Sequence, residues 1–415
     1  MSPEKKRAPP PTQPFPDVLP SRSVPPVSPV VVLAPDTFKG SLTASEACAS
    51  MAGGLRRVWP QVEVRLCPMA DGGEGTLEVI FAGAADAGSR VVRQVRAVRA
   101  AGGHSTAAAY GIVEDSDGRS GRSAIVEVAQ IVGITDRGTM AIPVESRSTQ
   151  GVGELLRALL DEGLRRFQIA LGGTSTNEGG AGMLEALGAR LLDSSGAAVP
   201  PLPSALDRIE RVDLTALDPR LAECELVLLS DVDNPLCGPC GTTLTFGPQK
   251  GVTDADLAKL DVALARYADR VESALGRRVA ESPGAGAAGG LGFALLALGG
   301  TLRSGAEFVA DLVGLDAALQ GAHWLIAGEG RSDAQTLRGK APLVAARRAR
   351  AAGVPATLLS GALDAAALPE LGRHFDGCFA IAAGPTTLAA SIANAAALLA
   401  DGAEQLARLW DAARD

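Results

Sequence analysis

One pattern recurs along the chain and limits the folds open to it: a short apolar strand, a polar glycine-rich loop, then a helical segment. The four strands of this pattern are expected at Val30–Ala34, Phe167–Leu171, Glu225–Ser230 and His323–Ala327. The first, a continuous β-branched run, is typical of a strand buried on both faces. Strands that alternate with helices predict an α/β fold with largely parallel sheets. The polar loops are then expected at the carboxyl ends of the strands, where such sheets bind ligands.

The segments after these loops carry helix signals. Thr43–Glu46 reads as a capping box, Ala181–Leu187 continues as a helix, and Pro342 suits the first turn of another. Tyr110–Val113 and Ala124–Ala129 look different, because they resemble paired strands of a second domain. The alanine- and leucine-rich stretch after residue 386 predicts a packing helix.

Composition excludes several classes of function. The 415 residues leave room for two domains. A net charge of −8 argues against a nucleic-acid partner, and 3% aromatic residues argue against a platform for stacking single-stranded bases. No apolar run reaches the roughly 18 residues of a membrane span, so no membrane association is expected.

The N-terminal segment, residues 1–29, holds ten of the 26 prolines and no apolar core of a secretory signal. It is predicted to be a disordered tail outside the fold. Six cysteines in so long a chain do not form a disulfide scaffold, so a reduced, cytoplasmic enzyme fits best.

Lysine is scarce, and its placement is informative. The chain has 33 arginines and six lysines, and three of those lysines (Lys39, Lys250 and Lys340) occur in glycine-rich loops. A lysine ammonium is a compact point charge, whereas an arginine guanidinium is a rigid planar fork. Lysines kept to such loops indicate phosphate handling, with chance placement as the alternative.

Acidic residues gather at the same strand ends and loops: Asp36, Asp71, Glu74, Glu178, Asp231, Asp233, Glu329 and Asp333. Phosphoryl transfer uses carboxylates to hold Mg²⁺, cations to hold phosphates, and one acid to accept a hydroxyl proton. Any single one of these acids could instead cap a helix or form a turn. Their clustering with lysines in separate loops favours the catalytic interpretation.

Two further motifs are weaker. Gly284–Gly289 matches G-x-G-x-x-G, but the preceding Arg277–Pro283 is not an apolar strand, so a dinucleotide site is disfavoured. The segment still predicts a turn that opens a helix and offers Gly286 to a phosphate, with tight packing of small residues as the alternative. Cys237–Cys240 resembles a thioredoxin motif in the wrong context, and its redox activity stays open. No Walker A sequence occurs, which excludes a P-loop kinase.

Taken in order, the loops resemble those of the class I family of bacterial glycerate kinases, from about Val30 to about Leu363. The segments that carry the resemblance are Ala34–Leu42, Pro68–Thr76, Gly172–Gly182, Asp231–Gly241, Phe246–Gly251, Pro283–Gly292 and Gly328–Pro342. The chain departs from the family pattern at Thr37, Val152, Glu178, Ser332 and Cys240. Cys240 stands where arginine is frequent, so a phosphate role for that position is in doubt.

This resemblance implies ATP-dependent phosphorylation of glycerate with Mg²⁺. It also implies a flavodoxin-like three-layer α/β/α domain built from both chain ends, at residues 30–85 and 285–415. A second α/β domain, residues 86–284, would be inserted between them. The partners are then the small molecules glycerate and ATP, and the oligomeric state is left open, a homodimer included. The 2-hydroxyl is favoured as acceptor, with 3-phosphoglycerate as the other product.

Roles for individual residues follow from loop chemistry and the resemblance together. Lys39, Lys250 and Lys340 are expected to stabilise phosphates, and Asp36, Asp231 and Asp333 to accept the proton or, for the last two, to bind metal. Arg331 could hold the substrate carboxylate as a bidentate fork. The remaining expected substrate or phosphate ligands are Asp71, Glu74, Thr174, Asn177 and Gly286. Two other functions stay open: an NAD(P)-dependent hydroxy-acid dehydrogenase built on the Gly284 motif, and a non-catalytic, ligand-sensing relative suggested by residues 152, 178 and 240.

Overall fold

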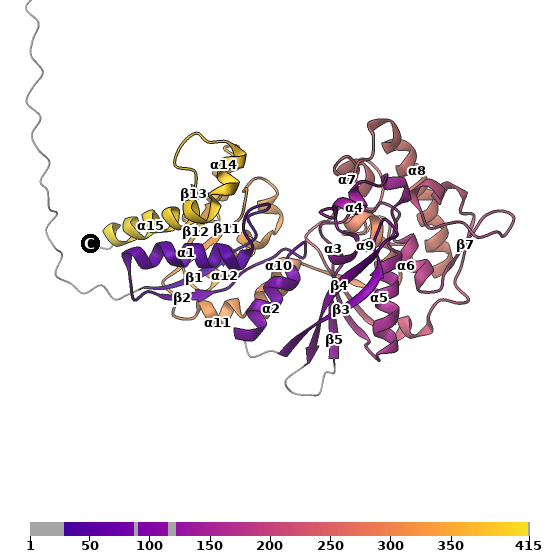
Figure 1. Cartoon of the computed structure of the whole chain (residues 1–415), viewed down its shortest axis with the longest axis horizontal. Helices are drawn as coiled ribbons and strands as arrows, with labels where there is room; N and C mark the ends of the chain where they lie inside the picture. Colours follow the sequence, from indigo (N-terminus) through magenta and orange to yellow (C-terminus); the bar gives the residue numbers. More distant parts are fainter. Residues whose placement is uncertain (1–28, 87–89, 115–121, 414–415) are drawn as a thin grey trace, which may run out of the picture.

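The computed structural model describes residues 29–86, 90–114 and 122–413, so the predicted tail lies outside the described residues except for Pro29. Two sheets follow one another along the long axis of the molecule, each with its own helices (Figure 1). Among the described helices, none is both long and apolar enough to cross a membrane.

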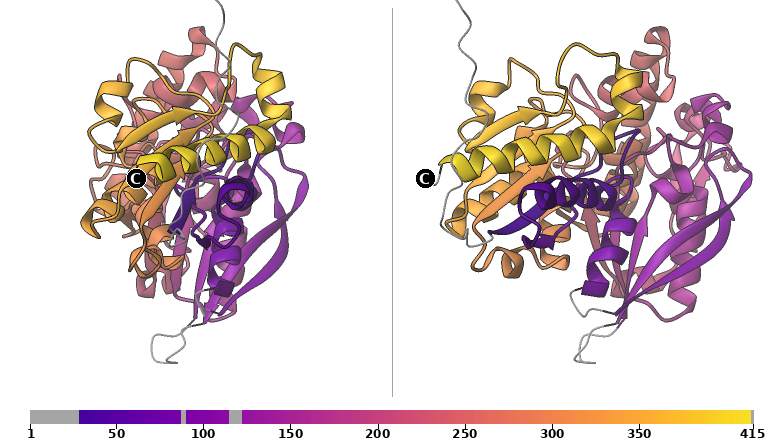
Figure 2. Two further views of the ribbon diagram at one scale, coloured as in Figure 1. Left: turned by 90° about the vertical axis from the view of Figure 1, so that its left-hand side faces the viewer. Right: turned by 60° about the vertical axis from the view of Figure 1, so that its left-hand side comes forward.

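The first sheet has five parallel strands from both ends of the chain, in the order β13-β12-β11-β1-β2. Their bounds are β1 Val30–Pro35, β2 Glu63–Leu66, β11 Trp324–Gly328, β12 Ala356–Ser360 and β13 Gly377–Ala380. Successive side chains of a strand point to opposite faces. Accordingly Val31 and Leu33 pack under the helices α1 (Ala44–Val58) and α15 (Ala395–Ala413), whereas Val32 and Ala34 pack under α12 (Ala341–Ala351). Figure 2 shows α15 alongside α1 on one face of this sheet.

The second sheet has six strands in the order β10-β9-β6-β5-β4-β3. Their bounds are β3 Arg90–Arg99, β4 Ser105–Glu114, β5 Arg122–Glu127, β6 Arg166–Ala170, β9 Glu225–Leu229 and β10 Thr301–Arg303. The strands from β10 to β5 run parallel, and β5, β4 and β3 form an antiparallel edge. The largest apolar core of the molecule joins this sheet to α5 (Gln150–Asp161), α6 (Ala181–Ala186), α8 (Asp254–Leu275) and α9 (Ala287–Ala297).

Two helices lie between the sheets, α2 (Thr76–Asp86) and α10 (Gly305–Leu312) (Figure 1). Val79 of α2 packs in the core of the five-stranded sheet, whereas Leu77 and Ile80 pack against Ile125 of β5. The remaining helices are α3 Ala129–Val132, α4 Arg137–Met140, α7 Thr242–Lys250, α11 Leu315–Leu319, α13 Leu368–Leu371 and α14 Leu388–Ala393, with 3₁₀ turns at Val144–Ser146, Pro203–Arg208, Pro219–Glu223 and Thr336–Arg338. A small separate sheet pairs β7 (Arg190–Leu192) with β8 (Arg211–Asp213).

The strands and helix starts predicted from sequence are confirmed. The four predicted strands are β1, β6, β9 and β11, and the predicted strand pair is found in β4 and β5, where Tyr110 faces Val126. The capping box of α1 is complete, with Thr43 Oγ1 accepting the Glu46 N–H at 3.2 Å and a Glu46 carboxylate oxygen accepting the Thr43 N–H at 2.8 Å. Pro342 lies in the first turn of α12.

The expected boundary between residues 284 and 285 falls before two elements that contact the six-stranded sheet. Strand β10 pairs with β9, and Leu291 and Phe293 of helix α9 lie in the core of that sheet. The chain therefore leaves that sheet only after Arg303. Because β10 has three residues, no pattern in the sequence marks it as a strand.

Candidate active site

Two carboxylates emerge side by side from the centre of the five-stranded sheet. Pro35 of β1 pairs with Gly328 of β11, so the next residues, Asp36 and Glu329, leave neighbouring strands at the same edge. Both are nearly buried, at 8% and 6% exposure. Burial raises the pKa of Asp36 well above its ordinary value, and the charges of Asp71 and Glu329 add to the rise. Glu329 accepts hydroxyl hydrogen bonds from Ser332 and Thr336, at 2.9 and 2.6 Å.

Asp71 connects this pair to the other sheet. It lies in the loop between β2 and α2, where its Oδ1 accepts the N–H of Gly73 at 3.1 Å. Its negative charge raises the pKa of Asp36, of Glu329 and also of Asp231, which follows β9 of the six-stranded sheet. The loop that carries Asp71 runs between the carboxyl ends of the two sheets, since the Met69 N–H donates to the Pro35 carbonyl at 2.9 Å and a Cβ on Gly72 would lie 2.9 Å from the Leu229 carbonyl oxygen.

Asp231 completes the acidic group. Burial raises its pKa to about 7, and Asp71 adds to the rise, while the Ser304 hydroxyl and the first backbone N–H groups of α10 oppose it. Among the described residues its buried Oδ2 atom has no hydrogen-bond partner. Asp231 therefore offers a free carboxylate oxygen at the junction of the sheets.

The loops of the five-stranded sheet supply the cations at this edge. Lys340 precedes α12, and its charge lowers the pKa values of both Asp36 and Glu329. Lys39 is exposed in the loop after β1, which packs against Gly330 of the β11 loop. Arg331 is also exposed, 3.9 Å from Asp333 and 4.0 Å from Asp364. Asp333 is half-buried and accepts the Gln335 N–H at 2.8 Å.

Lys250 has a different environment. The segment expected as a loop is the end of α7, and Lys250 is 2% exposed there, with Nζ donating to the Thr176 carbonyl oxygen at 2.7 Å. Burial lowers its pKa to about 7, although the charge of Glu178 favours the protonated form. The described contacts of Lys250 are all within the six-stranded half, so this arrangement does not bring it together with Lys39 and Lys340.

Other predicted ligands lie around this buried lysine or at the loop surface. Asn177 is fully buried, donates to Thr243 Oγ1 at 2.9 Å, and has an Oδ1 atom without a partner among the described residues. Thr174 is buried in the loop after β6, and Glu178 accepts hydrogen bonds from Thr149 and Ala181. Glu74 is exposed and accepts a hydrogen bond from Thr135.

Gly286 and Cys237, from the two weaker motifs, lie in surroundings that do not suit phosphate binding or redox chemistry. The N–H of Gly286 donates to the Asn234 carbonyl at 2.9 Å, and a Cβ there would lie 2.4 Å from the Pro235 carbonyl oxygen. This geometry supports the close-packing alternative for the motif rather than a free amide for phosphate. Burial and the charge of Asp261 raise the pKa of Cys237 to about 12, which disfavours the thiolate needed for redox chemistry.

Sequence reasoning gave no individual role to three residues at the junction: Glu127, Ser304 and Glu329. Ser304 caps α10 by accepting the Glu307 N–H, and the spacing Ser-x-x-Glu is a signal that could have found it. Glu127 ends the apolar run of β5 and has no such signal, because its partners are 50 and 52 residues away in the chain.

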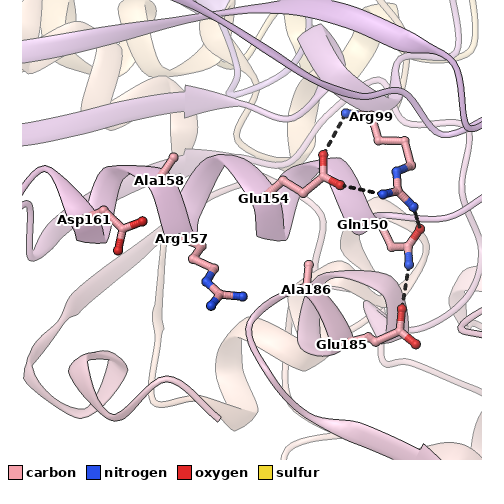
Figure 3. Close-up of a pocket in the computed structure, with 8 residues that line it drawn as sticks. All are labelled: Arg99, Gln150, Glu154, Arg157, Ala158, Asp161, Glu185 and Ala186. Atoms are coloured by element: carbon pink, nitrogen blue, oxygen red, sulfur yellow. Dashed lines mark hydrogen bonds and ion pairs between the residues drawn. The ribbon is translucent and has the colours of Figure 1, made fainter. Parts of the chain in front are cut away.

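Two hollows of the described surface lie away from the junction of the sheets. One of about 400 Å³ lies beside α5 and α6 and contains none of the predicted site residues (Figure 3). Arg99 there bonds to Glu154 and Gln150, and Gln150 bonds to Glu185, so these polar groups satisfy one another. A second hollow, of about 270 Å³, lies at the amino ends of β12 and β13. Because the strand ends concentrate the perturbed carboxylates, we assign the site to the junction of the sheets.

Buried carboxylates and loop cations at the carboxyl ends of parallel strands define an α/β enzyme that acts on a charged, oxygen-rich substrate. Residues 31–411 match the model of the glycerate kinase family, and the chain belongs to this family. The resemblance found in the sequence is thereby confirmed.

Known proteins of similar sequence agree with this assignment. The chain is 38% identical to the glycerate kinase of Bacillus subtilis (strain 168) over 384 residues, which cover 91% of this chain and 96% of that protein. It is 37% identical to the glycerate 2-kinase of Escherichia coli (strain K12), over 80% and 85% of the two chains. A crystal structure from Salmonella typhimurium LT2, described as a glycerate kinase 2, has a TM-score of 0.75 and 36% identity, over 93% and 99% of the chains.

Proposed function

We propose that the protein is a glycerate kinase that transfers the γ-phosphate of ATP to a hydroxyl of D-glycerate. A bond forms between the glycerate oxygen and the γ-phosphorus, the bond to the β-phosphate oxygen breaks, the hydroxyl proton passes to a carboxylate, and ADP leaves. The observation that carries the proposal is family membership across residues 31–411 combined with the acidic group at the junction of the sheets. A dehydrogenase is not favoured, because Gly286 of the glycine motif is closely packed against the backbone of Pro235. A non-catalytic relative is not favoured, because the matched family is a family of kinases.

Asp36 and Asp231 are the proposed proton acceptors. A carboxylate with a raised pKa holds a proton more tightly, so both are stronger bases than ordinary aspartates. The free Oδ2 of Asp231 gives it an accepting atom at the junction. Lys39 and Lys340 lie at the same edge and are proposed to stabilise the phosphates, with Asp71 and Glu74 orienting substrate. Among the described residues no carboxylate lies closer than 3.9 Å to Arg331, so its guanidinium is proposed to bind the carboxylate of glycerate.

The carboxyl oxygens at the junction fit Mg²⁺, a hard cation that takes one or two carboxylates and completes its shell with phosphate and water oxygens. The unpartnered Oδ2 of Asp231 suits such a ligand, and when it binds the ion the role of proton acceptor falls to Asp36. Asp333 already accepts the Gln335 N–H with its Oδ1 atom. In the described ranges, no three His, Cys, Asp or Glu side chains are grouped closely enough to hold a metal by themselves. When bound, Mg²⁺ would neutralise charge on the transferred phosphoryl group.

Lys250, Thr174 and Asn177 are proposed to act from the six-stranded half after a rearrangement, whereas the Gly286 N–H already donates to the Asn234 carbonyl and is not proposed as a phosphate ligand. Lys250 would have to release the Thr176 carbonyl before its ammonium could reach a phosphate. Asn177 needs less change, because its Oδ1 atom is already without a described partner.

We further propose that the molecule consists of a flavodoxin-like domain with a second α/β domain inserted into it. The order β13-β12-β11-β1-β2 corresponds to the flavodoxin order 2-1-3-4-5 read from the other edge. The insertion would run from β3 to β10, that is, from about residue 90 to residue 303. We also propose that the protein is cytoplasmic. A homodimer is the oligomeric state proposed for testing.

The 2-hydroxyl is the proposed acceptor, because an Escherichia coli relative is named glycerate 2-kinase. A coupled ADP-release assay with D-glycerate, ATP and Mg²⁺ tests the activity, and ³¹P NMR of the product tests the position. We expect glycerate-dependent ADP release and 2-phosphoglycerate. Absence of ADP release would contradict the kinase, and nicotinamide reduction with glycerate would support the dehydrogenase instead.

A further inference from the structure

Glu127, at the carboxyl end of β5, reaches out of its own sheet to the start of α2. It is 1% exposed, and its Oε1 atom accepts the N–H of Gly75 at 3.2 Å while Oε2 accepts the N–H of Leu77 at 2.9 Å. The first N–H groups of a helix have no partner within the helix. Glu127 therefore caps α2 from a strand about 50 residues away in the chain.

The loop that this cap fixes is the one that carries Asp71. Within it, the Thr76 hydroxyl donates to the Gly73 carbonyl at 2.7 Å, and Asp71 accepts the Gly73 N–H. The loop also contacts the loop after β6 through its backbone, where the Gly72 carbonyl accepts the Gly172 N–H at 3.1 Å. Among the described residues outside this loop, Glu127 is the charged residue whose side chain hydrogen-bonds to the loop backbone.

Both oxygens of the carboxylate are needed for this arrangement. Oε1 also accepts the Gln130 side-chain N–H at 3.3 Å, so the group receives three donors. A glutamine at this position has one acceptor oxygen, and its amide nitrogen would face a backbone N–H. The negative charge is also favourable at the positive N-terminal end of α2.

We propose that Glu127 is a positioning residue for phosphoryl transfer, which acts by holding the Asp71 loop across the junction of the two sheets. The Asp71 loop contacts the ends of both sheets, since the Met69 N–H donates to the Pro35 carbonyl at 2.9 Å and a Cβ on Gly72 would lie 2.9 Å from the Leu229 carbonyl oxygen. A shift of this loop therefore changes the distance from Asp71 to the acidic groups that follow β1 and β9. This inference rests on the proposed kinase activity. Misplacement by about 1 Å can cost an enzyme about a hundredfold in rate.

The test compares Glu127→Gln with Glu272→Gln, a matched control. Glu272 is also a buried carboxylate, 4% exposed, and accepts two backbone N–H groups, from Val279 and Ala280 at 2.6 and 2.8 Å, but it is not part of the junction. We expect Glu127→Gln to lower kcat about 10- to 100-fold with little change in KM. The control variant Glu272→Gln is expected to keep kcat within about threefold of the wild-type value, including when its melting temperature is lower than that of the wild type.

A double-mutant cycle with Asp71→Asn separates positioning from general structural damage. If Glu127 acts through Asp71, adding Glu127→Gln to Asp71→Asn should cost less than about threefold in kcat. The proposal would be overturned if kcat of the double variant fell by the product of the losses in the two single variants. It would also be overturned if folded Glu127→Gln kept the wild-type kcat.

Hydrogen exchange supplies a readout that does not depend on activity. In Glu127→Gln the amides of Gly75 and Leu77 should exchange faster than in the wild type, while those of Val279 and Ala280 should not change. Unchanged protection of the Gly75 and Leu77 amides would contradict the capping of α2 by Glu127. A wild-type protein that does not release ADP would contradict the kinase function, but faster exchange in the variant would still support the cap.

Discussion

Lys250 shows how burial changes what a lysine can do. Its folded pKa of about 7 lies below the ordinary value of 10.5, so between these values the unfolded chain binds more protons than the folded protein. The free energy of unfolding therefore rises with pH through this window. A single site shifted this far contributes a rise on the order of 2 kcal/mol between about pH 7 and about pH 9.

Lys250→Met should remove this rise. Urea unfolding at about pH 7 and about pH 9 measures it, and the difference between the two pH values should shrink in the variant relative to the wild type. Lys259→Met is the control, since Lys259 is exposed on α8 and its loss should leave the pH dependence as it was. An equal pH dependence in Lys250→Met and wild type would mean that the buried ammonium is not the cause.

Lys340 acts on the acidic pair at the end of β1 and β11. Its charge lowers the pKa values of Asp36 and Glu329, so Lys340→Met should raise both. If ionised Asp36 is needed for turnover, the acidic limb of the profile of kcat/KM against pH should move to higher pH. A limb at the wild-type position would show that neither carboxylate controls the rate in its charged form.

At the scale of elements, α1 contains two adjacent glycines with opposite surroundings. A Cβ on Gly53 would meet nothing within 4 Å, whereas a Cβ on Gly54 would lie 2.0 Å from the Ala400 carbonyl oxygen of α15. Gly53→Ala should therefore stabilise the protein by about 0.5–1 kcal/mol through the backbone entropy of the unfolded chain.

Gly54→Ala should instead destabilise by at least about 2 kcal/mol, because α1 and α15 must move apart. Thermal unfolding of the two variants side by side checks both signs. Similar melting temperatures for the pair would mean that α15 does not pack closely on α1.

The elements that sequence predicted well are those whose signals are local. β1 and β11 are apolar runs, and the cap of α1 lies within four residues, so their partners need not be known. The end of α7 was expected as a loop because Pro248 and two glycines usually break helices, yet Pro248 lies inside this helix and Gly251 ends it with a left-handed φ of 95°. Burial of Lys250 and the reach of Glu127 depend on which strands become neighbours, and one sequence does not contain that information.

At the scale of the whole molecule, the two sheets meet through glycine. A Cβ on Gly172, just after β6, would lie 2.3 Å from the Cα of Gly73 in the Asp71 loop. Gly172→Ala should therefore move the carboxyl ends of the sheets apart.

We expect kcat in Gly172→Ala to fall at least about tenfold, because the spacing between the Asp71 loop and the carboxyl end of the six-stranded sheet would change. Gly53→Ala, which adds the same methyl group in open space, serves as the control and should keep wild-type kcat. Wild-type kcat in Gly172→Ala would show that the contact between the sheets does not set the geometry of the site.

The five-stranded sheet also affects how the chain is made. Its strand β1 leaves the ribosome early, but its neighbour β11 begins about 290 residues later. At about 5–20 residues per second, β1 waits roughly 15–60 s for that partner. During this time the six-stranded sheet can form through β9, while one edge of β1 has no strand to pair with and Val31 and Leu33 lack the cover of α15. Synthesis from end to end thus leaves this edge of the first strand in need of protection by a chaperone or by transient contacts until the last quarter of the chain begins to emerge.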